Sequence, residues 1–182
     1  MQKNIVRIAT NAVLIAVYVV LSMLAIPIGG LKVTFEHFPV VLCAVVFGPI
    51  DALLVGGIGE LINQLTSFGI TPTTVLWILP IVSRGLIVGI CSRTIKGHMT
   101  PAAIVNKHIP TIFLAVCIFS GVISSMLNTL ALYVDSKMFG YYSFAMVFGA
   151  LAVRILLSVI TSIVIGIAIK PILHALRHAN LI

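Results

Sequence analysis

Residues Ile8–Ile26, near the start of the chain, read IATNAVLIAVYVVLSMLAI and contain no charged side chain. A helix needs about 20 apolar residues to cross the roughly 30 Å hydrocarbon core of a bilayer. Lys3 and Arg7 precede this run, and a basic start of this kind is also typical of a cleaved signal peptide. The run is too long for the apolar region of a signal peptide, and the rest of the chain is equally apolar. It therefore predicts an uncleaved first transmembrane helix, which is broken at Pro27.

The composition of the whole chain indicates the same class of protein. Of its 182 residues, 60% are hydrophobic and 8% are charged, whereas soluble domains average about 45–50% and about 25%. The 11 Lys+Arg and 4 Asp+Glu residues cannot coat the surface of a water-soluble fold. This excludes a disordered chain, a fibrous repeat and a soluble nucleic-acid binder. We therefore expect an integral membrane protein with no nucleic-acid partner.

Five further apolar segments follow the first, and together they predict six membrane spans. The second and third are short and are joined by Gly48-Pro49, which favours a buried or re-entrant hairpin over two lipid-facing helices. No linker is long enough to separate domains, and the two halves lack the similarity of an inverted-repeat transporter. We therefore expect an all-α membrane protein in which residues 1–182 form one compact six-helix bundle. The five segments are Phe38–Phe47, Ala52–Leu65, Val75–Ser92, Ile109–Val134 and Ser143–Lys170.

The basic residues predict the orientation of these spans. Cytoplasmic loops of membrane proteins carry an excess of Lys and Arg. With the N-terminus in the cytoplasm, seven basic residues lie in cytoplasmic segments and two lie outside. We therefore expect both termini to be cytoplasmic, and the net charge of +7 to follow from this topology. The cytoplasmic residues are Lys3, Arg7, Arg93, Lys96, Lys107, Lys170 and Arg177, and the outer ones are Lys32 and Lys137.

Three charged side chains lie within the predicted spans: Glu60, Arg84 and Arg154. A charge in a bilayer costs about 2.5–3.5 kcal/mol even on lenient insertion scales, so each is a candidate functional residue. Glu60 can form a structural pair with one arginine, but the other arginine is then left without a counter-charge. A guanidinium binds a carboxylate through two parallel hydrogen bonds. We therefore expect Arg84 and Arg154 to bind the acidic group of a small molecule, and Glu60 to orient an arginine.

Other polar and aromatic side chains are placed to complete such a site. Asn63 and Gln64 follow Glu60 at helical spacing, and Trp77 lies in the same span as Arg84. An aromatic wall with hydroxyl groups would suit a flat heterocycle or a polyol. Further candidates come from the fifth span and from two outer loops around residues 31–37 and 67–74. They are Asn128, Thr71, Thr73, His37 and Lys32. A lone histidine such as His37 is, however, more often an interfacial side chain than a ligand-binding one.

No catalytic or metal-binding motif accompanies these residues. The sequence contains no P-loop, HExxH or GxSxG motif. Cys43, Cys91 and Cys117 lie in apolar runs without the spacing of metal ligands or redox pairs. We therefore expect no enzyme activity, no metal and no cofactor. Two alternatives remain open: a self-sufficient proton-coupled secondary transporter or channel with Glu60 as a proton relay, and an intramembrane enzyme or assembly subunit.

Two pairs of small residues occur at helical spacing. Ala12 and Ala16 share a face of the first span, and Gly85 and Gly89 share a face of the fourth. Small residues four positions apart let two helices approach closely. Either face can pack inside the bundle or dock a partner helix, and the spacing alone does not decide between the two.

Taken together, these features resemble the substrate-binding S components of energy-coupling factor (ECF) vitamin transporters. The matching features are six spans in 182 residues, the Ala12-xxx-Ala16 motif, and the Phe47-Gly48-Pro49 turn between the second and third spans. Within this group the chain is most similar to the branch that contains the folate and pantothenate components. It lacks the Tyr-Phe-Pro-Gly-like stretch of folate components and has FGITPTT at residues 68–74 instead.

The resemblance implies a function and a set of partners. An S component binds a water-soluble vitamin with high affinity near the outer side of a bacterial plasma membrane, under the first and third outer loops. It docks through the alanine face of its first span on a transmembrane coupling protein with two cytoplasmic ATPases, and ATP use topples it to release the vitamin. Pantothenate, which has a carboxylate and hydroxyls, suits Arg84 and Arg154; folate and other vitamins or their precursors remain open.

Overall fold

The computed structural model describes all residues except 1, 29–30, 96–100, 102–103, 105–110 and 179–182. Long helices dominate it, and one short hairpin of two strands interrupts them. In chain order the elements are α1 (Gln2–Met23), β1 (Ile26–Ile28), β2 (Leu31–Val33), α2 (His37–Val46), α3 (Pro49–Ser67), α4 (Thr74–Thr94), α7 (Thr111–Met138), α8 (Phe144–Phe148) and α9 (Leu151–His178).

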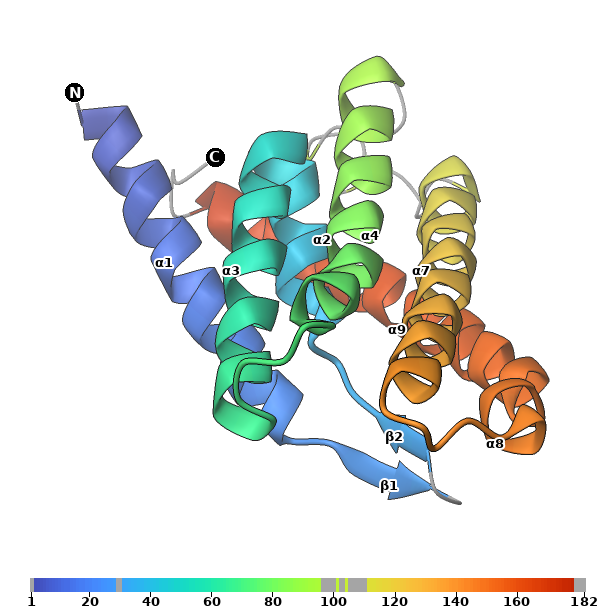
Figure 1. Cartoon of the computed structure of the whole chain (residues 1–182). Helices are drawn as coiled ribbons and strands as arrows, with labels where there is room; N and C mark the ends of the chain where they lie inside the picture. The colour runs from blue at the N-terminus through green and yellow to red at the C-terminus, as the bar shows by residue number, and fades with distance from the viewer. Residues whose placement is uncertain (1, 29–30, 96–100, 102–103, 105–110, 179–182) are drawn as a thin grey trace.

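The helices α3, α4 and α7 stand side by side, while α1 is inclined and α9 crosses obliquely behind them (Figure 1). The closest packing is between α3 and α4, between α4 and α7, and between α7 and α9. Four segments of the described chain are long and apolar enough to cross a membrane: Asn4–Met23, Thr74–Thr94, Thr111–Met138 and Phe144–Leu176. These confirm a multi-pass helical membrane protein. The helix α2 is too short to cross alone, and α3 does not meet the same criterion, so the count of six spans stays a prediction.

The short helix α2 forms the centre of the bundle. Seven consecutive residues, Pro39–Val45, are buried, so no face of this helix meets the surface there. It packs against α1, α3, α4 and α9. A helix that is apolar all round is stable only when other helices surround it. This agrees with the expected buried hairpin of the second and third segments.

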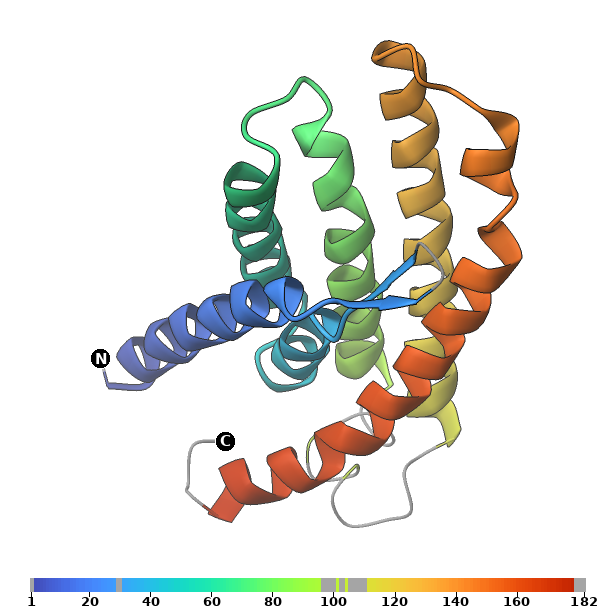
Figure 2. The same ribbon diagram turned by 90° about the horizontal axis from the view of Figure 1, so that it is seen from below.

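The strands β1 and β2 are the main departure from the expected all-helical fold. They pair antiparallel, with Ile26 opposite Val33 and Ile28 opposite Leu31. The hairpin lies across one end of the bundle (Figure 2). Apolar residues on both sides of Gly29-Gly30 are a sequence signal for a hairpin. The interpretation of this stretch as a helix break alone was therefore incomplete.

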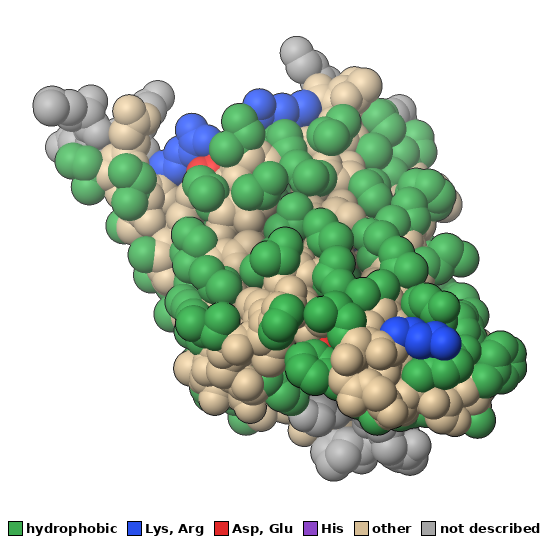
Figure 3. All heavy atoms as spheres, in the orientation of Figure 1, with side chains coloured by type: hydrophobic (Ala, Val, Ile, Leu, Met, Phe, Trp, Pro, Cys, Tyr) green, Lys and Arg blue, Asp and Glu red, His purple; other side chains and the backbone are tan. Residues whose placement is uncertain are grey.

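The ends of the chain agree with an even number of crossings. The start of α1 and the end of α9 lie at the same end of the bundle as the α2–α3 turn, and the hairpin lies at the opposite end (Figure 1). Basic side chains Arg7 and Arg93 belong to the first of these ends, where Figure 3 shows blue patches near the top of the molecule. That this end faces the cytoplasm remains a prediction from the basic residues.

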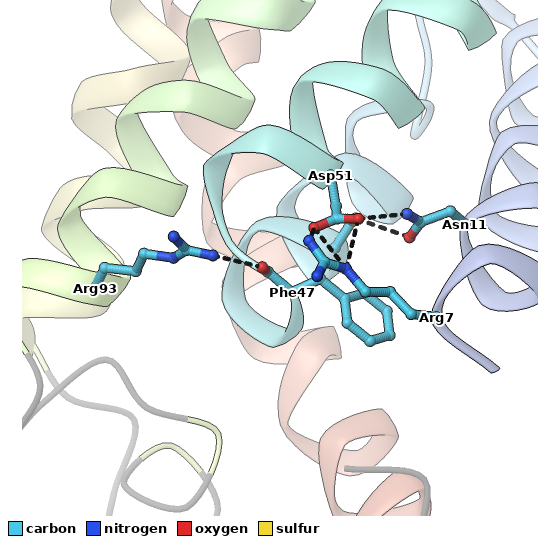
Figure 4. A network of polar contacts seen from close by, with 6 residues as sticks. Arg7, Asn11, Phe47, Asp51 and Arg93 are labelled. Carbon is cyan, nitrogen blue, oxygen red and sulfur yellow. Dashed lines mark hydrogen bonds and ion pairs between the residues drawn. The ribbon is translucent and has the colours of Figure 1, made fainter. Parts of the chain in front are cut away.

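The turn between α2 and α3 depends on glycine. Gly48 has a φ of +95°, a backbone conformation that residues with a side chain rarely adopt. A Cβ at this position would also overlap the guanidinium of Arg93. Arg93 Nη2 donates to the carbonyl of Phe47 over 3.1 Å, which satisfies an orphan acceptor at the end of α2 (Figure 4). A Cβ on Gly89 of α4 would lie 2.5 Å from Cα of Pro49. The glycine face of α4 is therefore used inside the bundle, against this turn.

A buried carboxylate ties α1 to the same turn. Asp51 is 4% exposed and forms a salt bridge with Arg7. It accepts hydrogen bonds from Arg7 Nε over 2.9 Å and from Asn11 Nδ2 over 2.6 Å (Figure 4). The sequence suggests only that Asp51 caps the third helix, but the residue before that helix is Gly48 and Asp51 instead points toward α1.

We expect Asp51→Asn to lower the free energy of unfolding in detergent by about 1.5–3 kcal/mol, as is typical for hydrogen bonds to charged groups. Denaturant unfolding followed by helical circular dichroism measures this. A double-mutant cycle with Arg7→Gln isolates the pair, since the two losses should add to more than the loss in the double variant. Strictly additive losses would contradict the proposed contact.

Candidate ligand-binding site

A cavity of about 290 Å³ lies between the hairpin and the helices. This is at the lower end of the range for small-molecule sites, about 300–1,000 Å³. Val33, Thr34 and His37, which lie in or after β2, form the wall on the side of the hairpin. Side chains of α1, α3, α4, α7 and α9 form the rest. Of the residues selected from the sequence, the cavity is lined by His37, Glu60, Trp77, Asn128 and Arg154.

Glu60 is held in the cavity wall by neutral donors. It is 7% exposed and accepts hydrogen bonds from the hydroxyl of Tyr18 over 2.7 Å, from Asn63 over 3.1 Å and from Gln64 over 2.6 Å. Asn63 and Gln64 therefore support Glu60 and do not line the cavity themselves. The expected pairing of Glu60 with an arginine is not seen among the described residues.

The two arginines within the predicted spans occupy different environments. Arg84 is 1% exposed, donates from Nη2 to Ser162 over 2.8 Å, and leaves Nε without a hydrogen-bond partner among the described residues. It does not line the cavity. Arg154 does line it, and its guanidinium donates to the carbonyls of Val147 over 3.1 Å and Met146 over 3.2 Å. Arg154 thus holds the short helix α8 against the cavity.

The remaining walls combine aromatic and hydroxyl groups. Trp77 of α4 and Tyr18 of α1 supply the aromatic surface. Ser124 of α7 donates to the carbonyl of Pro80 over 2.9 Å, so its hydroxyl is fixed in position. His37 at the start of α2 has a buried Nδ1 without a hydrogen-bond partner in the described structure. Further hydroxyl and amide groups come from Ser125, Asn128, Ser158 and Thr161.

A comparison with protein-family models matches residues 2–178 to the family described as ECF-type riboflavin transporter, S component. The chain belongs to this family. No curated protein matches it. This S component is therefore the substrate-binding subunit of an ECF vitamin importer, and it is not an enzyme. The expected family is confirmed, but its folate and pantothenate branch is not supported, because the matching model is named for riboflavin.

In this S component the loop between α3 and α4 is attached to α7. The hydroxyls of Thr71 and Thr73 lie 3.2 Å apart, and Thr73 also donates to the carboxylate of Asp135. Asp135 accepts a second hydrogen bond from Tyr141, which raises the pKa of Tyr141 to about 12. Thr71 and Thr73 do not line the cavity. The backbone of Lys32 pairs with Pro27, and its side chain lies outside the described residues.

The two pairs of small residues have different surroundings in the S component. Ala12 and Ala16 are both exposed on α1. Gly85 and Gly89 are buried, and a Cβ on Gly85 would lie 3.0 Å from Val40 and 3.1 Å from Ala52. The glycine face therefore packs against α2 and α3, while the alanine face is left free.

Sequence reasoning missed several residues that line the cavity, among them Tyr18, Ser158 and Thr161. Tyr18 was one aromatic residue in an apolar span, and its contact with Glu60 joins residues 42 positions apart. The hydroxyls of Ser158 and Thr161 were also passed over, although three positions separate them and a helix therefore brings them to one face. The stripe of small polar residues along α9 was a usable signal for a polar cavity wall.

Proposed function

We propose that this S component captures riboflavin, or a compound with the same flat ring and polyhydroxyl chain, in the cavity. The mixed lining carries this proposal: Trp77 and Tyr18 offer surface for a planar heterocycle, and Ser124, Asn128 and Thr161 offer hydrogen bonds for hydroxyl groups. Riboflavin is also the vitamin in the name of the matching family.

The arginines favour a neutral ligand over pantothenate or folate. An acid would need a guanidinium with free donors in the cavity. Arg84 does not reach the lining, so the cavity contains one guanidinium instead of the two expected from the sequence, and two of the five N–H donors of that guanidinium, in Arg154, are bonded to the carbonyls of α8. One of the two arginine charges that suggested an acidic ligand, that of Arg84, is therefore located in the helix core and not in the cavity.

The purified chain tests the choice of vitamin directly. The fluorescence of riboflavin should be quenched when it binds. Pantothenate or folate at equal concentration should not compete with riboflavin and should leave this quenching unchanged. Mass spectrometry of small molecules released from the freshly purified protein gives an independent answer. Release of pantothenate or folate from the purified protein, with no quenching of riboflavin, would overturn the proposal in favour of the acid-binding alternative.

Arg154→Gln separates the two ligand classes by the size of its effect. If Arg154 donates one hydrogen bond to a neutral ligand, affinity should fall by about 0.5–1.5 kcal/mol, roughly 2- to 12-fold. If it forms a buried charge pair with an acid, the loss should be about 2–5 kcal/mol. Titration calorimetry of the variant measures this, with Arg84→Gln as the matched change outside the cavity.

We also propose that the chain works with a transmembrane coupling protein and two cytoplasmic ATPases in a bacterial plasma membrane, with both its termini cytoplasmic. The sequence has no P-loop of its own, and the exposed face around Ala12 and Ala16 is available for a partner helix. Uptake of riboflavin only when the ATPase module is co-expressed would support this. Uptake by the chain alone, driven by a proton gradient, would instead support a secondary transporter.

The hairpin is expected to be the moving part of the site. Val33 and the residues after it line the cavity, whereas Thr73 fastens the α3–α4 loop to Asp135. A buried ligand needs an entrance that opens and closes. Hydrogen exchange in peptides covering residues 26–36 should therefore slow on addition of riboflavin, and exchange in residues 68–73 should change much less. Equal slowing in both segments would contradict a hairpin gate with a fixed second loop.

A further inference from the structure

A second concavity lies on the outside of the bundle and shares no lining residue with the first. It has a volume of about 380 Å³, between α7 on one side and α8 with the start of α9 on the other. Its walls are apolar, and the hydroxyl of Thr129 within them donates to the carbonyl of Ser125 and is thus satisfied inside α7. The lining residues are Met126, Thr129, Leu130, Tyr133, Phe148 and Leu151. We call this surface the α7–α8 groove.

The side chain of Lys137 places a positive charge beside the groove. Lys137 follows Tyr133 by one helical turn at the end of α7, and its Nζ lies 6.0 Å from the centre of the Tyr133 ring and 4.2 Å from that of Tyr142. Tyr133 and Tyr142 pack edge to face at 5.5 Å. Lys137 forms no ion pair within the described part of the chain. The nearby carboxylate of Asp135 is already bonded to Thr73 and Tyr141.

This order of groups along α7 matches the order of groups in a phospholipid. From Met126 to Tyr133 the helix rises about 10 Å, at about 1.5 Å per residue, and presents an apolar channel. Tyrosine and lysine follow at the end of the helix, where such side chains meet the headgroup region of a bilayer. A lysine at that level lies close to the lipid phosphates, and its positive charge favours a headgroup with a net negative charge. The structure therefore combines a slot for an acyl chain with a positive charge at the level of a phosphate.

We propose that the α7–α8 groove binds an anionic phospholipid, with one acyl chain between α7 and α9 and the phosphate beside Lys137. This site is distinct from the vitamin cavity and does not depend on which vitamin is bound.

The test uses the full chain in nanodiscs made from phosphatidylglycerol and phosphatidylcholine, followed by native mass spectrometry of the lipids it retains. The unmodified chain should retain phosphatidylglycerol in preference to phosphatidylcholine. Lys137→Gln should lower this preference about fivefold, as expected for one basic residue near an anionic surface, and Lys137→Arg should keep it. Lys170→Gln removes the same charge near the other end of α9 and should lower this preference by less than Lys137→Gln does.

Leu130→Trp fills the groove without changing charge, and it should reduce retention of both lipids. Helical circular dichroism and the elution volume in size-exclusion chromatography show whether each variant is folded. Unchanged preference in folded Lys137→Gln, or equal loss in Lys170→Gln, would overturn the proposal. So would a dimer that Leu130→Trp dissociates, because the groove would then hold a second copy of the chain.

Discussion

Replacing Trp77 by alanine should weaken riboflavin binding by about 2–4 kcal/mol, roughly 30- to 900-fold, which is the range for an aromatic side chain that anchors a buried ligand. Trp77 is in the cavity wall, and alanine would remove the aromatic surface on which a planar ring can stack. Titration calorimetry of the purified variant gives the affinity without relying on protein fluorescence.

Trp77→Phe is the matched control, since it keeps a ring at the same place and should lose much less affinity. The chain contains one tryptophan, so quenching of its emission by riboflavin in the unmodified protein reports on this wall alone. A folded Trp77→Ala variant with unchanged affinity, together with emission that riboflavin leaves unaltered, would place the ligand elsewhere.

The second large effect concerns assembly with the ATPase module. The double variant Ala12→Leu/Ala16→Leu should bind riboflavin normally, yet lose co-purification with the module and lose uptake almost completely. Both alanines are exposed on α1, so leucine adds bulk to a free surface without disturbing the chain itself. Co-expression with affinity capture of the module, followed by an uptake assay in cells, measures both losses.

Two control variants define this result. Val13→Leu/Val17→Leu places the same two leucine side chains on an adjacent exposed part of α1 and should leave assembly intact. Gly89→Ala should instead lower the stability of the chain, because the added Cβ would meet the backbone of Pro49. Overpacking of this kind typically costs about 1–3 kcal/mol of stability. Normal uptake by the alanine double variant, or parallel loss of stability and vitamin binding, would contradict a docking face on α1.

The sequence by itself determined the class of the protein and the positions of its helices. Crossing a bilayer requires only a long enough apolar run, which is a local property of the chain. The fourth and fifth predicted segments therefore coincide with long helices, and the buried second segment coincides with α2. The first predicted segment runs past the end of α1 into β1, and the sixth is divided between α8 and α9. The break at Gly48-Pro49 was also readable, because glycine at positive φ and proline at the first helical position are local requirements.

The site could be read only in part, because it depends on how each helix is rotated about its axis. Arg84 and Arg154 look equivalent as charges in apolar runs, yet Arg154 faces the cavity and Arg84 faces Ser162. Glu60 was correctly singled out, but its partner Tyr18 lies on another helix and no spacing rule connects them. The identity of the vitamin depends on such convergent contacts, and hydropathy carries no information about them.

The tertiary structure also decided which small-residue face is internal. Ala12-xxx-Ala16 and Gly85-xxx-Gly89 are the same pattern in sequence, and both let helices approach closely. The glycine pair is covered by α2 and the α2–α3 turn, whereas the alanine pair stays exposed. Likewise, Asp51 looked like a helix cap until α1 brought Arg7 and Asn11 beside it. The local sequence determines that a helix face is small or charged. Only the packing of distant segments decides whether that face lies inside the bundle or stays exposed.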